Sequence, residues 1–243
     1  MTNNELLKII EHRPWPLPIE QWKYYQEWNR AIFLHWQVDE QVLREFVPKQ
    51  LELDSFQGTT WVSLVAFTME NIRPRILPSF EPISNFHEVN IRTYVRPNDK
   101  PGVYFLSIES SKRLSTWIAR TVSELPYRYS NIQRTANNYT VDNSEYGDNL
   151  SIDYENLRPV AKKTNLDKWL TERYALYQDS ESRINKFEIH HLEWPIEEIT
   201  IKNLTCKYSR FEKLLTGQPN LAHWSNGVKV IAWDKEKTGY NMA

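Results

Sequence analysis

The stretch that decides the fold is FHEVNIRTYV, residues 86–95. Its residues alternate in character, which is typical of a β-strand whose two faces meet different surroundings. One face holds Val89, Ile91 and Val95, and the other holds Phe86, Glu88, Asn90, Arg92 and Tyr94. Same-face neighbours on a strand lie about 6.6 Å apart, so the polar residues form a ladder. The ladder is either a solvated outer face or the lining of an enclosed space, and alternation alone leaves both open.

The segments around this strand also predict strands. Residues 24–36 alternate, with Tyr24, Trp28, Ile32, Leu34 and Trp36 expected on one face. A hairpin is expected from 51–53 and 60–69, and further strands at 103–108, 127–135, 139–141, 150–154, 183–190, 196–204 and 228–233. Many strands with few helices predict an α+β fold, in which a mainly antiparallel sheet wraps around a core.

Few segments have the helical pattern. Residues 4–11 predict a short helix, followed by a proline-rich arm, so residues 1–22 are expected to lie across the domain. Asp39 is expected to cap a second helix. A third is expected to begin at Ser110 or Ser111 and to end at Pro126, with Leu114, Trp117, Ile118, Val122 and Leu125 on its apolar stripe. No linker divides the chain, so we expect one domain over residues 1–243.

Composition excludes several classes of protein. The chain has 30 basic and 31 acidic residues and no basic run longer than Lys162-Lys163, which argues against nucleic-acid binding. Cys206 is the only cysteine and the histidines lack metal-binding spacing, so we expect no disulfide, no metal and no cofactor. No signal peptide and no apolar stretch of about 20 residues occurs, so we expect no membrane partner and a cytoplasmic location.

Several motifs together resemble the bacterial YqjF-like family, whose members are uncharacterised. They are RPWPLP at 13–18, FLHW at 33–36, FHEVNIRTYV at 86–95, GVYFLS at 102–107, LPY at 125–127, LTERY at 170–174 and WP at 194–195. The resemblance covers nearly the whole chain.

A fainter resemblance connects the chain to acetoacetate decarboxylase, through Asn29-Arg30, Asp39, Leu43, Val47-Pro48, the 51–54 segment, Arg120, Val122 and Pro126. It implies a closed, cone-like antiparallel β-barrel with flanking helices and an enclosed pocket. That enzyme forms an imine on a lysine whose pKa is lowered by an adjacent lysine. Tyr127 and Arg128 stand at the matching positions, and neither side chain can form an imine. Neither Lys112 nor the Lys162-Lys163 pair is expected to replace the missing amine.

The resemblance also implies a set of pocket residues. Arg30 and Glu88 match the pocket arginine and one pocket glutamate of the decarboxylase, and Ser63 or a neighbouring residue replaces the other glutamate. With the ladder facing a lumen, the expected ligand-binding residues are Arg30, Ser63, Asn90, Arg92, Tyr127 and Arg128, and Glu88 is the candidate acid or base. Trp28, Trp36, Tyr94, Tyr127 and Tyr129 are expected to flank the lumen.

The preferred hypothesis is binding of a small organic ligand, aromatic or carbonyl-containing. The alternative is a lyase, hydrolase or isomerase that uses Glu88 with Arg30 and Tyr127 and forms no imine. A third class is an interaction protein, in which the arm around Trp15 and Trp22 covers a partner or a second subunit of a homo-oligomer.

Overall fold

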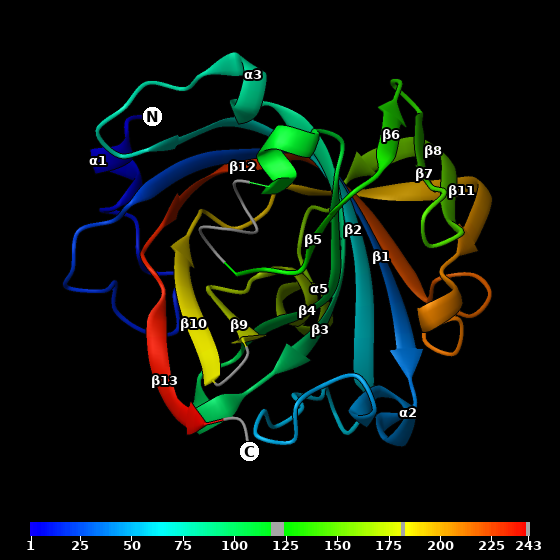
Figure 1. The fold of residues 1–243 in the computed structure, drawn as a ribbon, viewed down its shortest axis with the longest axis horizontal. Helices are drawn as coiled ribbons and strands as arrows, with labels where there is room; N and C mark the ends of the chain where they lie inside the picture. The colour runs from blue at the N-terminus through cyan, green and yellow to red at the C-terminus, as the bar shows by residue number, and fades with distance from the viewer. Residues whose placement is uncertain (118–123, 181–182, 242–243) are drawn as a thin grey trace.

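The computed structural model describes residues 1–117, 124–180 and 183–241, and it contains one large sheet (Figure 1). The strands are β1 (Tyr24–Val38), β2 (Thr60–Pro74), β3 (Phe86–Val95), β4 (Gly102–Ser110), β5 (Tyr127–Tyr129), β6 (Asn131–Arg134), β7 (Asn138–Asn143), β8 (Asp148–Pro159), β9 (Ala175–Ser180), β10 (Arg183–His190), β11 (Ile196–Lys207), β12 (Leu221–Ala232) and β13 (Glu236–Asn241). The helices are α1 (Asn3–Leu6), α2 (Glu40–Arg44), α3 (Glu81–Ser84), α5 (Asn165–Thr171), η1 (Pro97–Asp99) and η2 (Ser209–Phe211). The expected α+β class with a mainly antiparallel sheet is confirmed.

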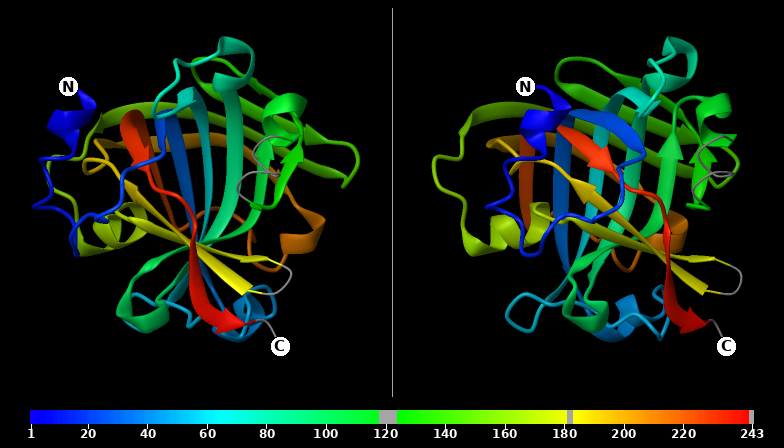
Figure 2. Two further views of the ribbon diagram at one scale, coloured as in Figure 1. Left: turned by 60° about the vertical axis from the view of Figure 1, so that its left-hand side comes forward. Right: turned by 90° about the vertical axis from the view of Figure 1, so that its left-hand side faces the viewer.

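The sheet returns on itself. Its order is β13-β10-β9-β4-β3-β2-β1-β12-β11-β8-β7-β6, and β10 also pairs with β12 through Ile189–Ala232 and His190–Ile231. The strands β10, β9, β4, β3, β2, β1 and β12 therefore form a closed ring, hereafter the ring. Among the described strands, the pairings of β4 with β5 and with β9 are parallel and the others are antiparallel. Figure 2 shows the ring strands curving around a common interior.

The two faces of the ring strands pack into two different cores. The outer face of β1, β2 and β3 packs against β7, β8 and the segment around η2, in a cluster that includes Leu34, Val62, Ile91, Tyr139 and Phe211. The inner face carries a second cluster, with Phe33, Phe67, Ile189, Trp194 and Val230. Because strand residues alternate between faces, the apolar side of β3 belongs to the outer core and its polar side turns inward.

A β-bulge in β1 corrects the expected face of that strand. Arg30 has a φ of 54°, and the pairing of β1 with β2 shifts by one residue between Asn29 and Ile32. An extra residue reverses the alternation beyond it. Trp28 therefore faces the ring interior, whereas Ile32, Leu34 and Trp36 face the outer core. The prediction that these aromatic and aliphatic residues share one face was wrong.

Other elements differ from their predictions in detail. Asp39 caps α2, as expected, and accepts hydrogen bonds from the backbone of Gln41 and Val42. The segment 127–135 forms two short strands instead of one, and Leu53 bridges to Val95 instead of joining a hairpin with β2. Of the expected helix near 111–125, residues 113–117 are helical, but Leu114 and Trp117 are exposed. Ile118 and Val122 lie outside the described residues.

The N-terminal arm packs against its own chain. The buried Arg13 guanidinium donates to the Ile189 carbonyl at 2.5 Å and pairs with Glu188 at 3.2 Å, and the Trp15 indole also donates to Glu188. Arg75 lies over the ring of Trp22 at 5.2 Å. The arm thus packs along β10 and beside the end of β12. None of the helices among the described residues is long and apolar enough to cross a membrane.

Candidate functional site

A cavity of about 140 Å³ lies inside the ring, and every ring strand contributes to its wall. The wall is formed by Tyr24, Gln26 and Trp28 of β1, Val65, Phe67 and Met69 of β2, Glu88, Asn90 and Arg92 of β3, Phe105, Leu125, Tyr127, Leu176, Phe187, Ile189, Trp194, Ala232 and Trp233, with Asp234 and Lys235. Most of these side chains are apolar. We call this space the ring pocket.

The polar ladder of β3 faces the ring pocket. Glu88, Asn90 and Arg92 are all buried and all line the cavity. Of the two possibilities for the ladder, a solvated outer face or the lining of an enclosed space, the structure therefore has the second. The strand is held in this register by antiparallel pairing with β2 on one side and β4 on the other. The sequence therefore places three polar side chains in a row on a rigid, hydrogen-bonded wall.

Glu88 is a carboxyl group in an apolar setting. Burial raises its pKa from the ordinary 4.5 to about 7, against the opposing effect of hydrogen bonds from Tyr127 and Asn90. The Tyr127 hydroxyl donates to the carboxyl at 2.9 Å, and the Asn90 amide donates at 3.4 Å. The pKa of Tyr127 is in turn raised by burial and by the Glu88 charge. The pair can accept or donate a proton near neutral pH.

Arg92 lines the pocket and forms no ion pair among the described residues, although the more distant Glu172 attracts its charge. Its side chain lies over the Phe33 ring at 5.9 Å, and it donates to the Leu170 carbonyl at 3.4 Å. Among the residues that the structure describes, no carboxylate lies within ion-pair distance of it, and its buried Nε has no hydrogen-bond partner. The Asn90 amide oxygen beside it also lacks one. Burial lowers the pKa of Arg92, but a guanidinium stays protonated.

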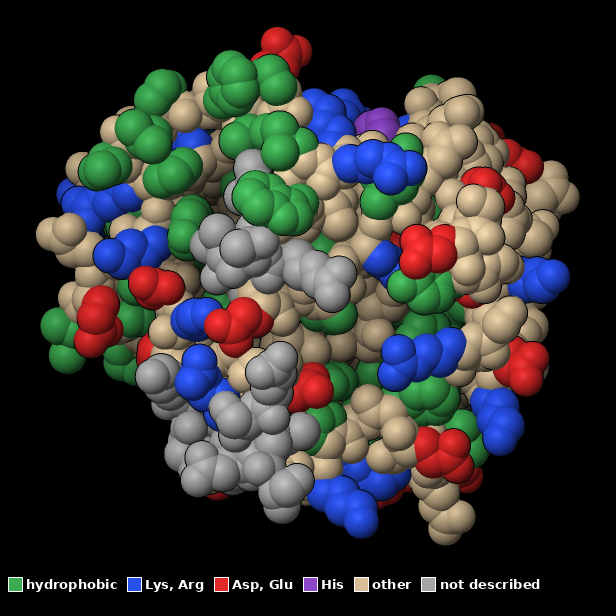
Figure 3. Space-filling model, viewed as in Figure 1, with side chains coloured by type: hydrophobic (Ala, Val, Ile, Leu, Met, Phe, Trp, Pro, Cys, Tyr) green, Lys and Arg blue, Asp and Glu red, His purple; other side chains and the backbone are tan. Residues whose placement is uncertain are grey.

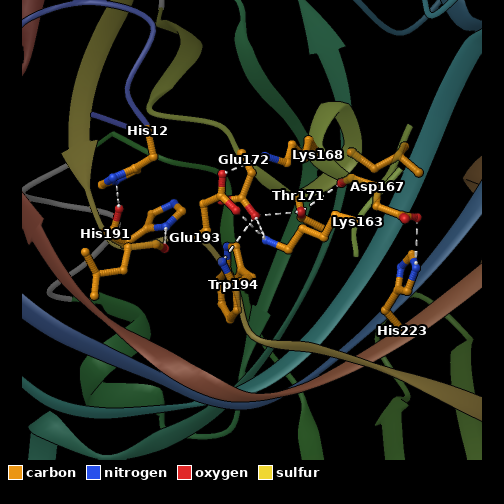
Figure 4. A network of polar contacts seen from close by, with 12 residues as sticks. His12, Lys163, Asp167, Lys168, Thr171, Glu172, His191, Glu193, Trp194 and His223 are labelled. Atoms are coloured by element: carbon orange, nitrogen blue, oxygen red, sulfur yellow. Dashed lines mark hydrogen bonds and ion pairs between the residues drawn. The ribbon is translucent and has the colours of Figure 1, made fainter. Parts of the chain in front are cut away.

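A buried polar network holds the pocket wall from behind (Figure 4). The Glu172 carboxylate pairs with Lys163 at 2.5 Å and accepts hydrogen bonds from the Thr171 hydroxyl and the Trp194 backbone. Burial raises the pKa of Glu172 despite the lysine. Trp194 lines the ring pocket and stacks on Trp28 with ring centroids 6.1 Å apart. The network therefore fixes one aromatic side of the pocket.

Three expected ligand-binding residues lie elsewhere. Arg30 sits on the bulge of β1, its side chain is 47% exposed, and it pairs with Glu70 at 3.0 Å. Ser63 is buried between the His35 imidazole and the Tyr94 hydroxyl, each at 2.6 Å, and does not line the cavity. Arg128 pairs with Glu109 at 2.9 Å and Asp148 at 2.8 Å, outside the ring pocket.

Three of the aromatic residues expected around the lumen are also placed elsewhere. Trp36 belongs to the outer core. Tyr94 packs against Trp169 and donates to the Leu170 carbonyl, and the half-exposed Tyr129 stacks under Arg113. Trp28 and Tyr127 do line the pocket. The bulge at Arg30 accounts for Trp36, because it turns the second half of β1 outward.

Some pocket residues were missed by the sequence-based prediction. Lys235 and Asp234 lie at the exposed rim of the cavity, and the Lys235 ammonium pairs with Glu124. Phe105 and Phe187 contribute to the apolar wall. Nothing local marks these positions, because β10 and β12 meet through pairings distant in sequence.

The described residues contain no group of three or more histidine, cysteine or acidic side chains placed to hold a metal ion. Cys206 is partly buried, and burial raises the pKa of its thiol to about 12, so it is a poor nucleophile at neutral pH. The buried polar groups of the β3 ladder and its partner in the ring pocket are Glu88, Asn90, Arg92 and Tyr127, and the other polar lining residues are Tyr24, Gln26, Asp234 and Lys235.

Solved structures with the same fold include acetoacetate decarboxylases and related enzymes. Acetoacetate decarboxylase from Legionella pneumophila is 12% identical, with a TM-score of 0.65 over 96% of this chain and 95% of that chain. The enduracididine biosynthesis enzyme MppR, in a complex with pyruvate, is 10% identical, with a TM-score of 0.60 over 92% and 93%. At these identities the likeness shows the fold alone. The acetoacetate-decarboxylase-like fold expected from the sequence is thereby confirmed.

Sequence comparison identifies the family of the chain. Residues 25–229 match the model of the DUF2071 family, described as an uncharacterized conserved protein. The uncharacterized protein YqjF of Bacillus subtilis (strain 168) is 34% identical over 227 residues, which cover 89% of this chain and 93% of that protein. The chain therefore belongs to the DUF2071 family and is a relative of YqjF.

Proposed function

We propose that the chain binds a small organic carboxylate in the ring pocket, and that it does so without an imine-forming lysine. The observation that carries the proposal is Arg92, a buried cation that lines the cavity and has no carboxylate of the described residues within ion-pair distance, the attraction of Glu172 acting from further away. A buried charge is tolerated when it is paired, so a ligand carboxylate supplies the missing partner.

The volume and the other lining residues of the pocket indicate the size and polarity of the rest of the ligand, beyond its carboxylate. A cavity of about 140 Å³ is close to the volume of an engineered apolar cavity that accepts benzene. Trp28, Phe67, Phe105 and Trp194 offer aromatic and apolar contact, and Glu88 with Tyr127 can hydrogen-bond a carbonyl or hydroxyl group. The solved MppR complex with pyruvate gives an example of this fold with a small carboxylate bound.

Isothermal titration with benzoate and pyruvate, and with the uncharged benzamide, tests the proposal. We expect the carboxylates to bind and benzamide to bind at least about tenfold more weakly, because charge-assisted hydrogen bonds contribute about 1.5–3 kcal/mol. Arg92→Met should remove the preference, whereas Arg92→Lys should keep part of it. Arg30→Met is the matched control, since Arg30 lies outside the pocket. Equal binding of benzoate and benzamide by the wild type would contradict the proposal.

The absence of imine chemistry has its own test. Tyr127 and Arg128 occupy the positions that match the decarboxylase lysines, and Lys235 at the rim is engaged with Glu124. Incubation with acetoacetate and borohydride, followed by mass spectrometry, should give no adduct on the chain. A reduced adduct on Lys235 would show that the pocket does supply an amine.

A second candidate function is acid–base catalysis, favoured by the pKa of about 7 at Glu88. A carboxyl group poised near the working pH can both take and return a proton, which typically contributes 10²–10⁴-fold to a rate. Turnover of keto acids and lactones should then fall by about that factor in Glu88→Gln. Equal rates in the two proteins would leave binding as the function.

The third hypothesis, an interaction protein that uses its arm, gains less support. Trp15 and Trp22 are partly buried and occupied by Glu188 and Arg75 of the same chain. A homo-oligomer stays a prediction, and light scattering that gives the mass of a single chain would contradict it.

A further inference from the structure

The loop between β2 and α3 exposes three large apolar side chains. Ile76 is 88% exposed, Leu77 is 55% exposed and Phe80 is 63% exposed. Figure 2 shows this loop and α3 beyond the ends of the ring strands, and Figure 3 shows hydrophobic side chains gathered over them on one face of the molecule. Single apolar side chains are ordinary on a surface, whereas several adjacent ones mark a surface that meets an apolar partner. We call residues 75–80 the apolar loop.

The backbone of the apolar loop finds hydrogen-bond partners within the chain. The Arg75 amide donates to the Lys23 carbonyl at 2.7 Å, and the Phe80 amide donates to the Ser84 hydroxyl at 2.8 Å. Pro78 has no amide hydrogen to satisfy. An unpaired backbone group is costly in apolar surroundings. The loop can therefore leave water at a lower cost than a loop whose amides are bonded to solvent.

Four basic side chains adjoin the apolar loop, those of Lys23, Arg73, Arg75 and Lys112. The Lys112 ammonium donates to the Glu81 carbonyl at 3.1 Å, which places it against α3. Glu81 carries the one negative charge between residues 72 and 84. Among the described residues, none of the four cations forms an ion pair with a carboxylate. The apolar side chains are thus bordered by an excess of positive charge.

Aromatic contacts hold two of these cations in place. The Arg73 guanidinium lies 4.7 Å from the Tyr25 ring centre, and the Arg75 guanidinium lies 5.2 Å from that of Trp22. Contact with an aromatic face fixes the position of a guanidinium group but does not neutralise its charge. Apolar side chains with cations beside them are the pattern by which proteins attach to a bilayer that contains anionic lipids.

The area of the apolar loop favours a lipid surface over a second protein chain. Side chains of this size bury roughly 200 Å² each when fully covered, so three of them offer less than about 600 Å². A stable protein interface buries about 800 Å² on each partner. A bilayer requires no matching shape and takes up a few apolar side chains at its boundary.

We propose that the apolar loop inserts into the surface of a lipid bilayer that contains anionic lipids. Ile76, Leu77 and Phe80 enter the boundary of the acyl chains, and the four cations lie at the level of the headgroups. The expectation of no membrane partner rested on the lack of a spanning segment, and attachment at the interface requires none.

Co-sedimentation of the intact chain with vesicles tests the proposal, using phosphatidylcholine alone and phosphatidylcholine mixed with phosphatidylserine. We expect binding to the mixed vesicles to be at least about tenfold stronger. Ile76→Ser combined with Phe80→Ser should weaken that binding about tenfold or more, because two large apolar side chains are lost. Lys23→Gln combined with Arg75→Gln should remove most of the preference for phosphatidylserine.

Leu157→Ser is the matched control and should bind as the wild type does. Leu157 is 56% exposed on β8, which β12 and β11 separate from β1 in the sheet. All of the substituted side chains are exposed, so circular dichroism should show an unchanged fold.

A polarity-sensitive dye attached at Phe80→Cys reports insertion directly. Its emission should shift to the blue when mixed vesicles are added, and the same dye at Leu157→Cys should show no shift. Cys206 competes poorly for the dye, because it is partly buried and burial raises the pKa of its thiol to about 12.

Three results would overturn the proposal. The first is a failure of the wild type to sediment with the mixed vesicles, and the second is equal sedimentation of the wild type and the Ile76→Ser, Phe80→Ser variant. The third comes from light scattering without lipid. A mass of two chains that falls to one in that variant would make the apolar loop an interface between copies of this chain.

Discussion

The Tyr127 hydroxyl donates a 2.9 Å hydrogen bond to the Glu88 carboxyl inside the ring. The two residues come from β5 and β3, which both flank β4, so the contact spans the sheet across one strand. The sequence resemblance to acetoacetate decarboxylase predicts that Tyr127 stands at the position of that enzyme's lysine. An amine at this place would pair with Glu88 as a cation, whereas a phenol leaves the carboxyl free to hold its own proton. Near pH 7 the pocket therefore holds a phenol hydrogen-bonded to a carboxyl group that is close to its own pKa.

Glu88→Gln should change how stability depends on pH. The pKa of Glu88 is raised from 4.5 to about 7, so the folded protein holds this proton at pH values at which the unfolded chain has released it. The contribution of this bound proton to the free energy of unfolding is fully present below about pH 4.5. It falls by about 3 kcal/mol as the pH rises to about 7. Glutamine is neutral throughout, so the variant should lack this decline and be the more stable protein at pH 8.

Urea unfolding at pH 5, 6, 7 and 8 measures this difference, because the other titrating groups are common to both proteins. The free energy of unfolding of the wild type should fall relative to the variant across this range. Parallel curves at all four pH values would show that the carboxyl of Glu88 titrates normally.

Tyr127→Phe should raise the pKa of Glu88 further. The phenol hydrogen bond favours the ionised carboxylate, and its removal leaves burial to act with less opposition. The pH at which the stability of the wild type levels off should therefore move upward in the variant. Tyr129→Phe is the matched control, since its ring is half-exposed and contacts Arg113 instead of Glu88. An unchanged midpoint in Tyr127→Phe would contradict the hydrogen bond.

The sequence was most informative where one strand meets two contrasting environments. The alternation of residues 86–95 predicted β3 and identified Glu88, Asn90 and Arg92 as one face, and the resemblance to a closed fold turned that face inward. Asp39 was predicted because an N-cap is a local interaction. Both signals need only a few consecutive residues.

The errors arose where the structure depends on distant segments or on backbone irregularity. Arg30 adopts a positive φ without being a glycine, so nothing in its neighbourhood indicated the bulge that carries it and Trp36 out of the pocket. Lys235 reaches the pocket only because β12 closes the ring against β10. Strand order of this kind is not encoded in any short pattern, and it decided which aromatic residues surround the cavity.

Arg13→Ala should destabilise the fold through the N-terminal arm. Arg13 is buried, pairs with Glu188 and donates to the Ile189 carbonyl, so its loss leaves buried acceptors without one partner. Lys100 and Lys186 still contact Glu188, and we therefore expect a cost of about 2 kcal/mol instead of the larger loss of an isolated pair. Thermal unfolding measures the change. The exposed Arg158→Ala should cost less than about 1 kcal/mol, and equal losses in the two variants would mean that the arm adds little.

Gly227→Ala tests the packing of β12 against the bulged strand. Gly227 has a φ of 130°, and a Cβ there would lie 2.4 Å from the Trp28 carbonyl oxygen and 2.4 Å from the Asn29 side-chain oxygen. These atoms belong to the segment that places Trp28 in the ring pocket, so relief of the clash must move the strand and the pocket wall together. We expect a loss of several kcal/mol in the free energy of unfolding, with weaker ligand binding in the ring pocket.

Gly147→Ala is the matched control, because its φ is also positive at 67° but nothing lies within 4 Å of the added carbon. That control should cost only about 1–2 kcal/mol of backbone strain, and a comparable cost at Gly227 would show that β1 and β12 can separate without disturbing the pocket.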